Sequence, residues 1–292
     1  MYLNFYGLKE EPFRLTPDPR FLHLAEPHRT ALLAILEGLI YRKGLLVLTG
    51  PVGTGKTSLM HAAQYILTQK FRDKFKVRTA FIINPTLTRD DFLEALIDEL
   101  EVPCLGNSKP KRLLAINELL IRMHKEGGTT ILIIDEAHLL SSEVLEEIRL
   151  LTNFDNYREK LLQVVLCGQP ELAGVLARRE MMAVRQRVAV ASQLRKLRPA
   201  ETSAYIAERL HVAGLKGPSP FTDSAISEIQ VSTQGIPRLI NLLSDAALRI
   251  GYNVKQRPIE PGIIRQGALE LSLAELCQIG ATEQPGTLAA GM

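Results

Sequence analysis

The sequence has few cysteines, and the three that it has, Cys104, Cys167 and Cys277, lie far apart. It contains no Cys-x-x-Cys pair and no Cys/His cluster, so it indicates neither a disulfide framework nor a zinc site. Scattered thiols in an odd number are typical of a protein kept in a reducing compartment.

Long hydrophobic runs are also missing. No apolar run approaches the roughly 18 residues needed to cross a bilayer. The first residues, MYLNFYGLKEEPFRL, lack a basic segment followed by an apolar one, so no signal peptide is predicted. We therefore expect a cytoplasmic chain without a membrane span of its own, unless a partner holds it at a membrane.

A large excess of charge is absent as well, because the net charge is only +3 over 292 residues. Such a balance allows an anionic partner without requiring one. With 46% hydrophobic and 23% charged residues, the composition is that of a globular protein with one large domain or two modest ones. No internal repeats are present.

Short apolar runs that alternate with helical patterns dominate the first two thirds of the chain. We predict strands at 44–49, 77–83, 130–134 and 163–167, and helices at 27–41, 56–70, 109–125 and 145–151, with another helix capped by Thr88. Apolar strands separated by helices predict an α/β fold with a parallel sheet covered on both faces.

The two ends of the chain follow other patterns. Residues 1–20 contain three prolines, which favour an extended arm over a helix. After about residue 198 the strands stop, and helices are predicted at 200–214, 221–233, 236–252 and 259–271. Residues 279–292 are small and polar, and we expect them to be disordered.

The loop G-P-V-G-T-G-K-T at residues 50–57 fits the phosphate-loop pattern G-x-x-x-x-G-K-[ST] between a strand and a helix. Its glycines let backbone N–H groups face an anion, and the following helix adds its positive end. Lys56 can reach the β- and γ-phosphates of a nucleotide, and the Thr57 hydroxyl can bind Mg²⁺. The alternative is a glycine-rich turn without a ligand.

The letters D-E-A-H at 135–138 follow the apolar run ILII, at the end of a strand predicted to neighbour the phosphate-loop strand. Asp135 can orient magnesium there, and Glu136 can accept a proton from the attacking water. The alternative is a helix N-terminal pair of carboxylates. His138 is interpreted as a packing or polar-contact residue. A DEAH helicase needs two RecA-like cores, and the helices that follow do not supply a second one.

Three further stretches, LCGQPEL at 166–172, VRQRV at 184–188 and GIPRLIN at 235–241, make the chain resemble the AAA+ ATPases. Together with the opening YLNFYGLKEEPFRLTPDPRFLHL and EPHRTAL at 26–32, they resemble the ExeA-type general secretion pathway protein A family, over residues 1 to about 270. Relatives include TnsC-like and origin-recognition-type ATPases. The family usually continues into a membrane helix and a peptidoglycan-binding domain, which this sequence does not include.

The resemblance implies an AAA+ P-loop NTPase with a central parallel sheet and a small C-terminal helical lid. It implies an arm at 1–30 near the nucleotide, an α/β domain at 31–198, a lid at 199–272 and a tail at 273–292. The cofactors implied are ATP and Mg²⁺, with Thr57 and Asp135 as metal ligands. The residues expected to bind the nucleotide are Gly50, Pro51, Val52, Gly53, Thr54, Gly55, Lys56, Thr57, Ser58, His28, Pro237 and Arg238.

Catalytic roles also follow from the resemblance. Lys56 and Glu136 match the Walker lysine and base, Gln169 a γ-phosphate sensor, and Arg238 an arginine reaching the γ-phosphate from the lid. Arg187 matches an arginine finger acting across a subunit boundary, with Arg185 as the alternative, and Arg29 accompanies His28 near the adenine. The competing interpretations are surface charge for the two arginines, a strand-end cap for Gln169, and an exposed helix start for Pro237 and Arg238.

Three functions are compatible with these residues. The first is an oligomeric ATPase, a ring or filament, that remodels a secretion, pilus or polysaccharide complex, peripheral to the inner membrane through its partner. The second is a DNA-bound, TnsC-like regulator of transposition, and the third a nucleotide-gated adaptor with negligible turnover. The cations that could line a DNA surface are Lys70, Arg72, Lys74, Lys76, Arg78, Arg195, Lys196 and Arg198, and the alternative for them is a solvated face.

Overall fold

The computed structural model describes residues 2–16, 21, 25–70, 76–83, 86–103, 106, 108–156 and 159–273. The chain divides into two compact units. The α/β unit comprises Glu26–Gly50 and Lys56–Arg195, and the helical unit comprises Met1–Ala25, Pro51–Gly55 and Lys196–Met292. Each unit is described by itself.

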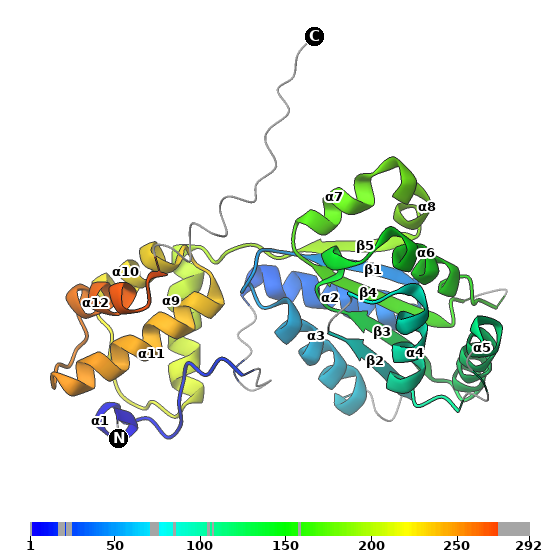
Figure 1. Cartoon of the computed structure of the whole chain (residues 1–292). Helices are drawn as coiled ribbons and strands as arrows, with labels where there is room; N and C mark the ends of the chain where they lie inside the picture. Colours follow the sequence, from blue (N-terminus) through cyan, green and yellow to red (C-terminus); the bar gives the residue numbers. More distant parts are fainter. Residues whose placement is uncertain are drawn as a thin grey trace, which may run out of the picture. The chain divides into compact units, whose positions relative to one another are not determined.

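The α/β unit is built on a five-stranded parallel sheet with the order β2-β3-β4-β1-β5 (Figure 1). The strands are β1 (Leu45–Thr49), β2 (Val77–Ile82), β3 (Thr129–Ile134), β4 (Leu162–Gly168) and β5 (Val188–Gln193). In register, β4 lies between its neighbours, with Leu166 opposite Ile134 of β3 and Val47 of β1. Because all pairs are parallel, the carboxyl ends of the strands meet at one edge of the sheet.

Helices cover both faces of this sheet (Figure 1). Alternate strand residues such as Val47, Leu132 and Val164 enter the larger core with side chains of α4 (Arg89–Glu99), α5 (Lys109–Lys125), α6 (Ser142–Leu151), α7 (Glu171–Ala177) and α8 (Met182–Arg185). The opposite face contacts α2 (Glu26–Ile40) and α3 (Lys56–Tyr65). Gly38 of α2 crosses so close to β1 that a Cβ there would lie 2.4 Å from Leu46 Cδ2.

The predicted strands and helices of this unit are confirmed, with four differences. Helices α7 and α8 were not predicted. Strand β5 was not predicted, because an edge strand alternates half-buried with exposed residues and this one carries small residues rather than an apolar run. Helix α3 ends at Tyr65 and continues as a π-helix, Ile66–Lys70. Helix α6 begins earlier than expected, because the Ser141 side chain accepts a hydrogen bond from the backbone N–H of Val144 (3.3 Å).

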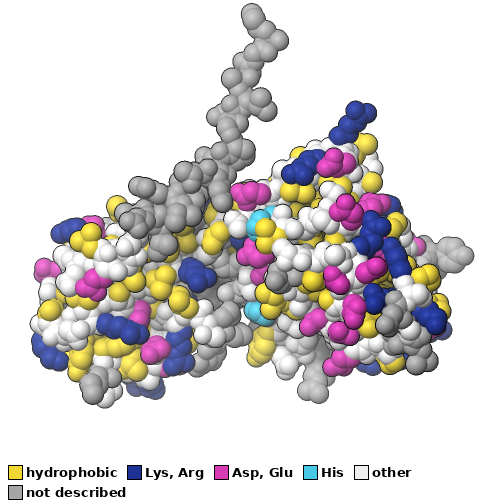
Figure 2. Space-filling model, in the orientation of Figure 1, with side chains coloured by type: hydrophobic (Ala, Val, Ile, Leu, Met, Phe, Trp, Pro, Cys, Tyr) yellow, Lys and Arg dark blue, Asp and Glu magenta, His cyan; other side chains and the backbone are white. Residues whose placement is uncertain are grey.

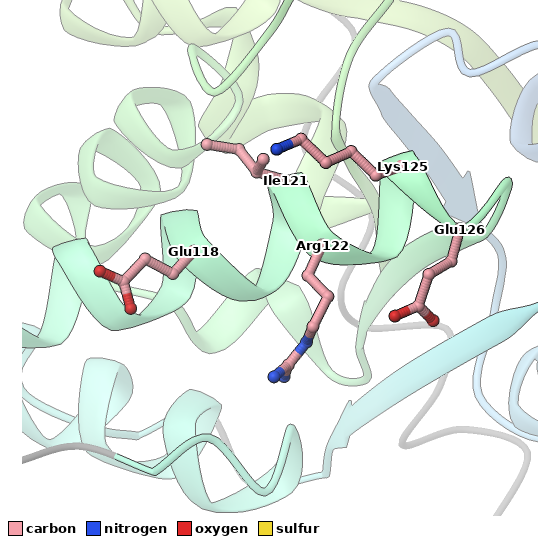
Figure 3. Close-up of a pocket in the computed structure, with 5 residues that line it drawn as sticks. All are labelled: Glu118, Ile121, Arg122, Lys125 and Glu126. Carbon is pink, nitrogen blue, oxygen red and sulfur yellow. The ribbon is translucent and has the colours of Figure 1, made fainter.

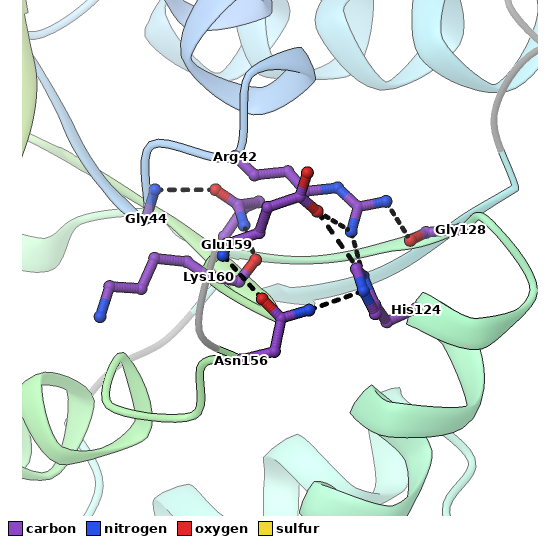
Figure 4. Close-up of polar contacts among 8 residues, drawn as sticks. Arg42, Gly44, His124, Gly128, Asn156, Glu159 and Lys160 are labelled. Atoms are coloured by element: carbon purple, nitrogen blue, oxygen red, sulfur yellow. Dashed lines mark hydrogen bonds and ion pairs between the residues drawn. The ribbon is translucent and has the colours of Figure 1, made fainter.

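A polar cluster ties together the amino ends of the strands, at the edge opposite the phosphate loop (Figure 4). The Arg42 guanidinium, just before β1, donates to Glu159 Oε2 (2.9 Å) and to the Gly128 carbonyl oxygen (2.8 Å), and it also contacts His124. Asn156 contacts the other ring nitrogen of His124 at 2.7 Å. The cluster therefore links α5 to the segments that precede β1, β3 and β4.

The helical unit contains α1 (Tyr2–Tyr6), α9 (Pro199–Val212), α10 (Asp223–Thr233), α11 (Pro237–Asn253) and α12 (Pro261–Glu270). The four predicted C-terminal helices are confirmed within three residues at each end. The prediction of an arm without helix is wrong for Tyr2–Tyr6, which precede the first proline and form one helical turn.

The N-terminal arm packs against this helical bundle. Its aromatic residues Tyr6, Phe13 and Phe21 belong to the bundle's core. Arg209 of α9 is buried and donates to the carbonyl oxygens of Pro12 (2.6 Å) and Arg14 (3.1 Å). The expected disordered segment at 279–292 lies outside the described residues. No helix in the described part of the chain has the length and apolar composition needed to cross a bilayer.

Candidate functional site

The loop Gly50–Thr57 joins β1 to α3 at the carboxyl edge of the sheet. Gly53 (φ +75°) and Gly55 (φ +94°) have left-handed backbone conformations that a side chain would strain. Between them Thr54 closes a turn, with its hydroxyl donating to the Pro51 carbonyl oxygen (2.7 Å). The loop therefore has the backbone conformation that a phosphate cradle requires.

Lys56, the first residue of α3, is buried, and its Nζ donates to the Gly50 carbonyl oxygen at 2.8 Å. Burial lowers the pKa of the Lys56 ammonium, and the nearby carboxylates of Glu136 and Asp135 offset part of that effect. A cation held in a partly desolvated place, with a backbone carbonyl as its neighbour, is suited to exchange that contact for the oxygens of a phosphate.

Thr57 and Asp135 are in direct contact, because the Thr57 hydroxyl donates to Asp135 Oδ2 at 2.6 Å. Asp135 is buried directly after β3, and its backbone N–H donates to the Ile82 carbonyl oxygen (2.9 Å). The expectation that its strand neighbours the phosphate-loop strand is wrong: β4 lies between β3 and β1. The start of α3 reaches across the end of β4, which brings the two side chains together.

The donor set at this contact fits magnesium. A hydroxyl and a carboxylate are the hard oxygen ligands that Mg²⁺ takes, and this ion is usually held by one or two carboxylates together with water and substrate phosphates. Within the described residues there is no cluster of three or more His, Cys, Asp or Glu side chains that could form an all-protein metal site.

Glu136 follows Asp135 in an unusual conformation. Its φ is 50°, in the left-handed region, and its backbone N–H donates to Asp135 Oδ1 at 2.9 Å. A non-glycine residue held there carries backbone strain, which clusters at functional sites. The side chain is 43% exposed, yet its Oε2 atom is buried and accepts no hydrogen bond. This oxygen therefore has free capacity to accept a proton.

Gln169 lies directly after β4, the strand that pairs with β1. The backbone N–H of Gly50 donates to the Gly168 carbonyl oxygen at 3.2 Å, so the phosphate loop begins beside Gln169. The Gln169 amide nitrogen lies 3.1 Å from Nε2 of His138, a contact between residues 31 positions apart. Sequence reasoning placed Gln169 at this edge and missed its contact with His138, for which the sequence holds no signal.

Arg185 and Arg187 are not near the carboxyl edge of their own sheet. Arg185 is the last residue of α8 and is exposed, and Arg187 is half-buried just before β5. Val188, the first residue of β5, pairs with Leu45, the first residue of β1. Six residues of β5, about 20 Å of strand, separate Arg187 from the carboxyl edge. Neither arginine can reach the phosphate loop of its own sheet.

The remaining predicted residues fall in both units. In the helical unit, Pro237 is buried at the start of α11, and the exposed Arg238 donates its backbone N–H to the Gly53 carbonyl oxygen at 3.2 Å. A Cβ at Gly53 would lie 3.0 Å from the Arg238 Cβ, so this approach requires glycine. In the α/β unit, His28 is buried in the first turn of α2 and Arg29 is exposed.

A surface pocket lies elsewhere, along the C-terminal half of α5 (Figure 3). It is lined by Glu118, Ile121, Arg122, Lys125 and Glu126. Because α5 leads into the amino end of β3, these residues do not belong to the carboxyl edge, and their two carboxylates and two cations largely balance.

Comparisons with known proteins find similarity over most of the chain. Residues 40–176 match the family described as AAA domain. General secretion pathway protein A of Aeromonas hydrophila is 38% identical over 273 residues, which are 93% of this chain and 49% of that protein. The chain therefore spans about half the length of this curated relative.

Solved structures of origin-recognition proteins share the fold. The ORC2 protein of Aeropyrum pernix, in its ADPNP and ADP complexes, has a TM-score of 0.68 at 16% identity, covering 90% of this chain and 72% of that one. The ORC1 protein of the same organism, in complex with DNA, has a TM-score of 0.68 at 16% identity, covering 92% of this chain and 72% of that one. The predicted fold class is thus confirmed: the chain has the AAA+ fold, its residues 40–176 match the AAA domain, and it is similar to general secretion pathway protein A over 93% of its length.

Proposed function

We propose that this AAA+ ATPase binds ATP with Mg²⁺ at the loop Gly50–Thr57, hydrolyses it within a homo-oligomer, and thereby remodels a protein complex of a secretion, pilus or polysaccharide system. The observation that carries the proposal is the 2.6 Å contact of Thr57 with Asp135, beside the unbonded Oε2 of Glu136. The 38% identity with general secretion pathway protein A supports a partner of the secretion class.

The side chains divide the chemistry between them. Bound at Thr57 and Asp135, Mg²⁺ would neutralise charge that develops on the phosphates. Lys56 leaves the Gly50 carbonyl oxygen and donates to the β- and γ-phosphates instead. Glu136 orients the attacking water and accepts its proton through the free Oε2. Gln169, at the end of the strand beside the phosphate loop, donates its amide to the γ-phosphate.

The position of Arg187 supports an oligomeric mechanism. About 20 Å of strand separates this arginine from the carboxyl edge of its own sheet, so it would serve the phosphates of a neighbouring subunit. An arginine supplied in this way is worth roughly 10³–10⁵ in rate in comparable phosphoryl-transfer systems. Arg238 would contribute from the same chain as its loop, since its backbone already contacts Gly53.

DNA binding is the second hypothesis, and the described cations favour it less. Three of the candidates are paired with carboxylates: Lys76 with Glu126, Arg78 with Glu101 at 3.2 Å, and Arg195 with Glu26 at 3.4 Å. Arg72 and Lys74 lie outside the described residues, as does the side chain of Lys70. On the visible face of the α/β unit, basic and acidic side chains are intermixed (Figure 2). Strongly salt-dependent binding to duplex DNA would favour this hypothesis over the first.

Mixing two inactive variants tests the proposed mechanism. Arg187→Ala keeps its own Lys56 and Thr57, and Glu136→Gln keeps its own Arg187, so each should bind ATP and hydrolyse it poorly. Mixed oligomers should regain activity, because some sites combine an intact Glu136 with an intact neighbouring Arg187. Steady-state ATP hydrolysis across mixing ratios is the measurement.

The controls separate the alternatives. Co-assembled mixtures that remain inactive would refute the trans role of Arg187 and make Arg185 the next residue to test. If Arg187→Ala alone hydrolysed ATP at the wild-type rate, Arg187 would be a surface charge without a catalytic role. A wild-type protein that binds ATP without turnover would be the nucleotide-gated adaptor.

A further inference from the structure

His138 bridges the ends of two strands in the α/β unit. It lies in a 3-10 turn, Ala137–Leu139, just after Glu136, and its side chain is only 10% exposed. Its Nδ1 atom is 3.4 Å from Glu136 Oε2 and 3.4 Å from the backbone nitrogen of Gln169. Its Nε2 atom is 3.1 Å from the side-chain nitrogen of Gln169. The His138 ring thus contacts both Glu136, which is proposed to orient the attacking water, and Gln169, which is proposed to contact the γ-phosphate.

The end of β4 is shaped to allow this approach. A Cβ at Gly168 would lie 3.1 Å from the backbone nitrogen of His138, which is tighter than most Cβ contacts. The glycine before Gln169 therefore lets the turn pack directly on the strand end. The contact of ring and amide depends on this close packing as well as on the side chains.

The hydrogen bonds select one tautomer of the ring. The backbone N–H of Gln169 donates to Nδ1, so Nδ1 carries no proton and Nε2 does. The structure places the Gln169 amide nitrogen at Nε2, so the Nε2 proton finds an acceptor when the amide turns over and its oxygen faces the ring. In this tautomer Nδ1 cannot donate to Glu136 Oε2, which agrees with that oxygen being buried without a hydrogen bond. The ring occupies the space beside the carboxylate without donating to it, so Oε2 stays free.

We infer that His138 is a positioning residue, which fixes the Glu136 carboxylate as a free proton acceptor and couples it to Gln169. This inference rests on the proposed function, since it assigns His138 a role in the same hydrolytic site. His138 acts through Glu136 and Gln169, which its ring approaches at 3.1–3.4 Å. Its loss should therefore lower kcat while ATP affinity stays unchanged.

Three variants separate a polar role from simple packing. His138→Ala removes the ring, His138→Phe keeps its shape without nitrogen atoms, and His138→Asn keeps an oxygen that can accept the Gln169 N–H. We expect about a tenfold loss of kcat in the Ala and Phe variants, at the low end of what losing an orienting partner costs. The Asn variant should stay within about threefold of wild type. KM and ATP affinity should change less than twofold in all three.

His124→Ala is the matched control, because it removes another partly buried histidine from a polar cluster at the opposite edge of the same sheet. Its kcat should match wild type, with unfolding monitored for every variant. The double variant His138→Ala/Gln169→Ala should be no slower than the slower single variant, since residues that act as a unit are not additive.

The outcomes are distinguishable from failure of the proposed function. A hydrolysing wild type with equal kcat in His138→Phe would overturn the positioning role and leave the ATPase assignment intact. So would a loss of kcat in His138→Ala that His124→Ala reproduces, or multiplicative losses in the double variant. A wild type that binds and hydrolyses no ATP would overturn the proposed function and the inference together.

Discussion

Replacing Lys56 by methionine should abolish ATP binding without destabilising the protein. Methionine keeps the length and apolar stem of the lysine and removes the ammonium. In the structure that ammonium is buried and donates a hydrogen bond to the Gly50 carbonyl oxygen. Because burial lowers its pKa, the folded protein disfavours the charged form at neutral pH.

The expected gain in stability is modest. Single stabilising substitutions typically contribute about 0.5–2 kcal/mol, and we expect the removal of this desolvated charge to fall in that range. The lost hydrogen bond to Gly50 offsets about 1 kcal/mol of it. The net change in stability is therefore between about −0.5 and +1 kcal/mol, and its upper end raises Tm by roughly 2–4 °C in a domain of 150–250 residues.

ATP should raise the Tm of the wild type but not that of Lys56→Met. A ligand at a hundred times its Kd stabilises the folded state by about 2.7 kcal/mol, which corresponds to roughly 5–10 °C in Tm for wild type. Lys56→Met should show no such shift, because the phosphates lose their cation. Calorimetry with and without Mg–ATP measures both effects on the same samples.

The difference in folding stability between wild type and Lys56→Met should also depend on pH. The folded pKa of Lys56 lies below its ordinary value of 10.5, so between the two values the unfolded chain binds a proton that the folded chain does not. Stability of the wild type therefore rises with pH across this window. The advantage of the methionine variant should shrink as the pH rises from neutrality toward 10.5.

Two results would refute this reasoning. A methionine variant that keeps the ATP-induced shift would remove Lys56 from the phosphate site. An apo variant destabilised by more than about 2 kcal/mol, beyond the loss of one hydrogen bond, would mean that the buried ammonium stabilises the fold.

Three further predictions concern single residues. Glu136→Gln should bind ATP like wild type and slow single-turnover hydrolysis by at least about 10²-fold; undiminished hydrolysis would remove Glu136 from the base role. Arg209→Met should lower the free energy of unfolding by about 3 kcal/mol, because the Pro12 carbonyl oxygen loses a charged donor; an unchanged urea midpoint would contradict it. Gly235→Ala should cost at least about 3 kcal/mol, since φ is +73° and the added Cβ would lie 2.0 Å from a backbone oxygen, whereas the unobstructed Gly217→Ala is the control.

The sequence by itself determined the elements that local patterns encode. The phosphate loop was evident because its glycines, lysine and threonine are contiguous, so chain connectivity alone places them between a strand and a helix. Strands β1, β3 and β4 were evident as apolar runs, because both of their faces are buried. The cap at Thr88 is equally local, because its hydroxyl oxygen accepts a hydrogen bond from the backbone N–H of Asp91, three residues later.

Only the tertiary structure decided what depends on strand order and long-range packing. The sequence could not say that β4 lies between β3 and β1, so the contact of Thr57 with Asp135, 78 positions apart, emerges only from the sheet. Edge strand β5 is not marked by a run of large apolar residues, because its side chains alternate between half-buried and exposed. His138 looked like an isolated histidine, and its contact with Gln169 exists because parallel pairing brings the ends of β3 and β4 to the same edge.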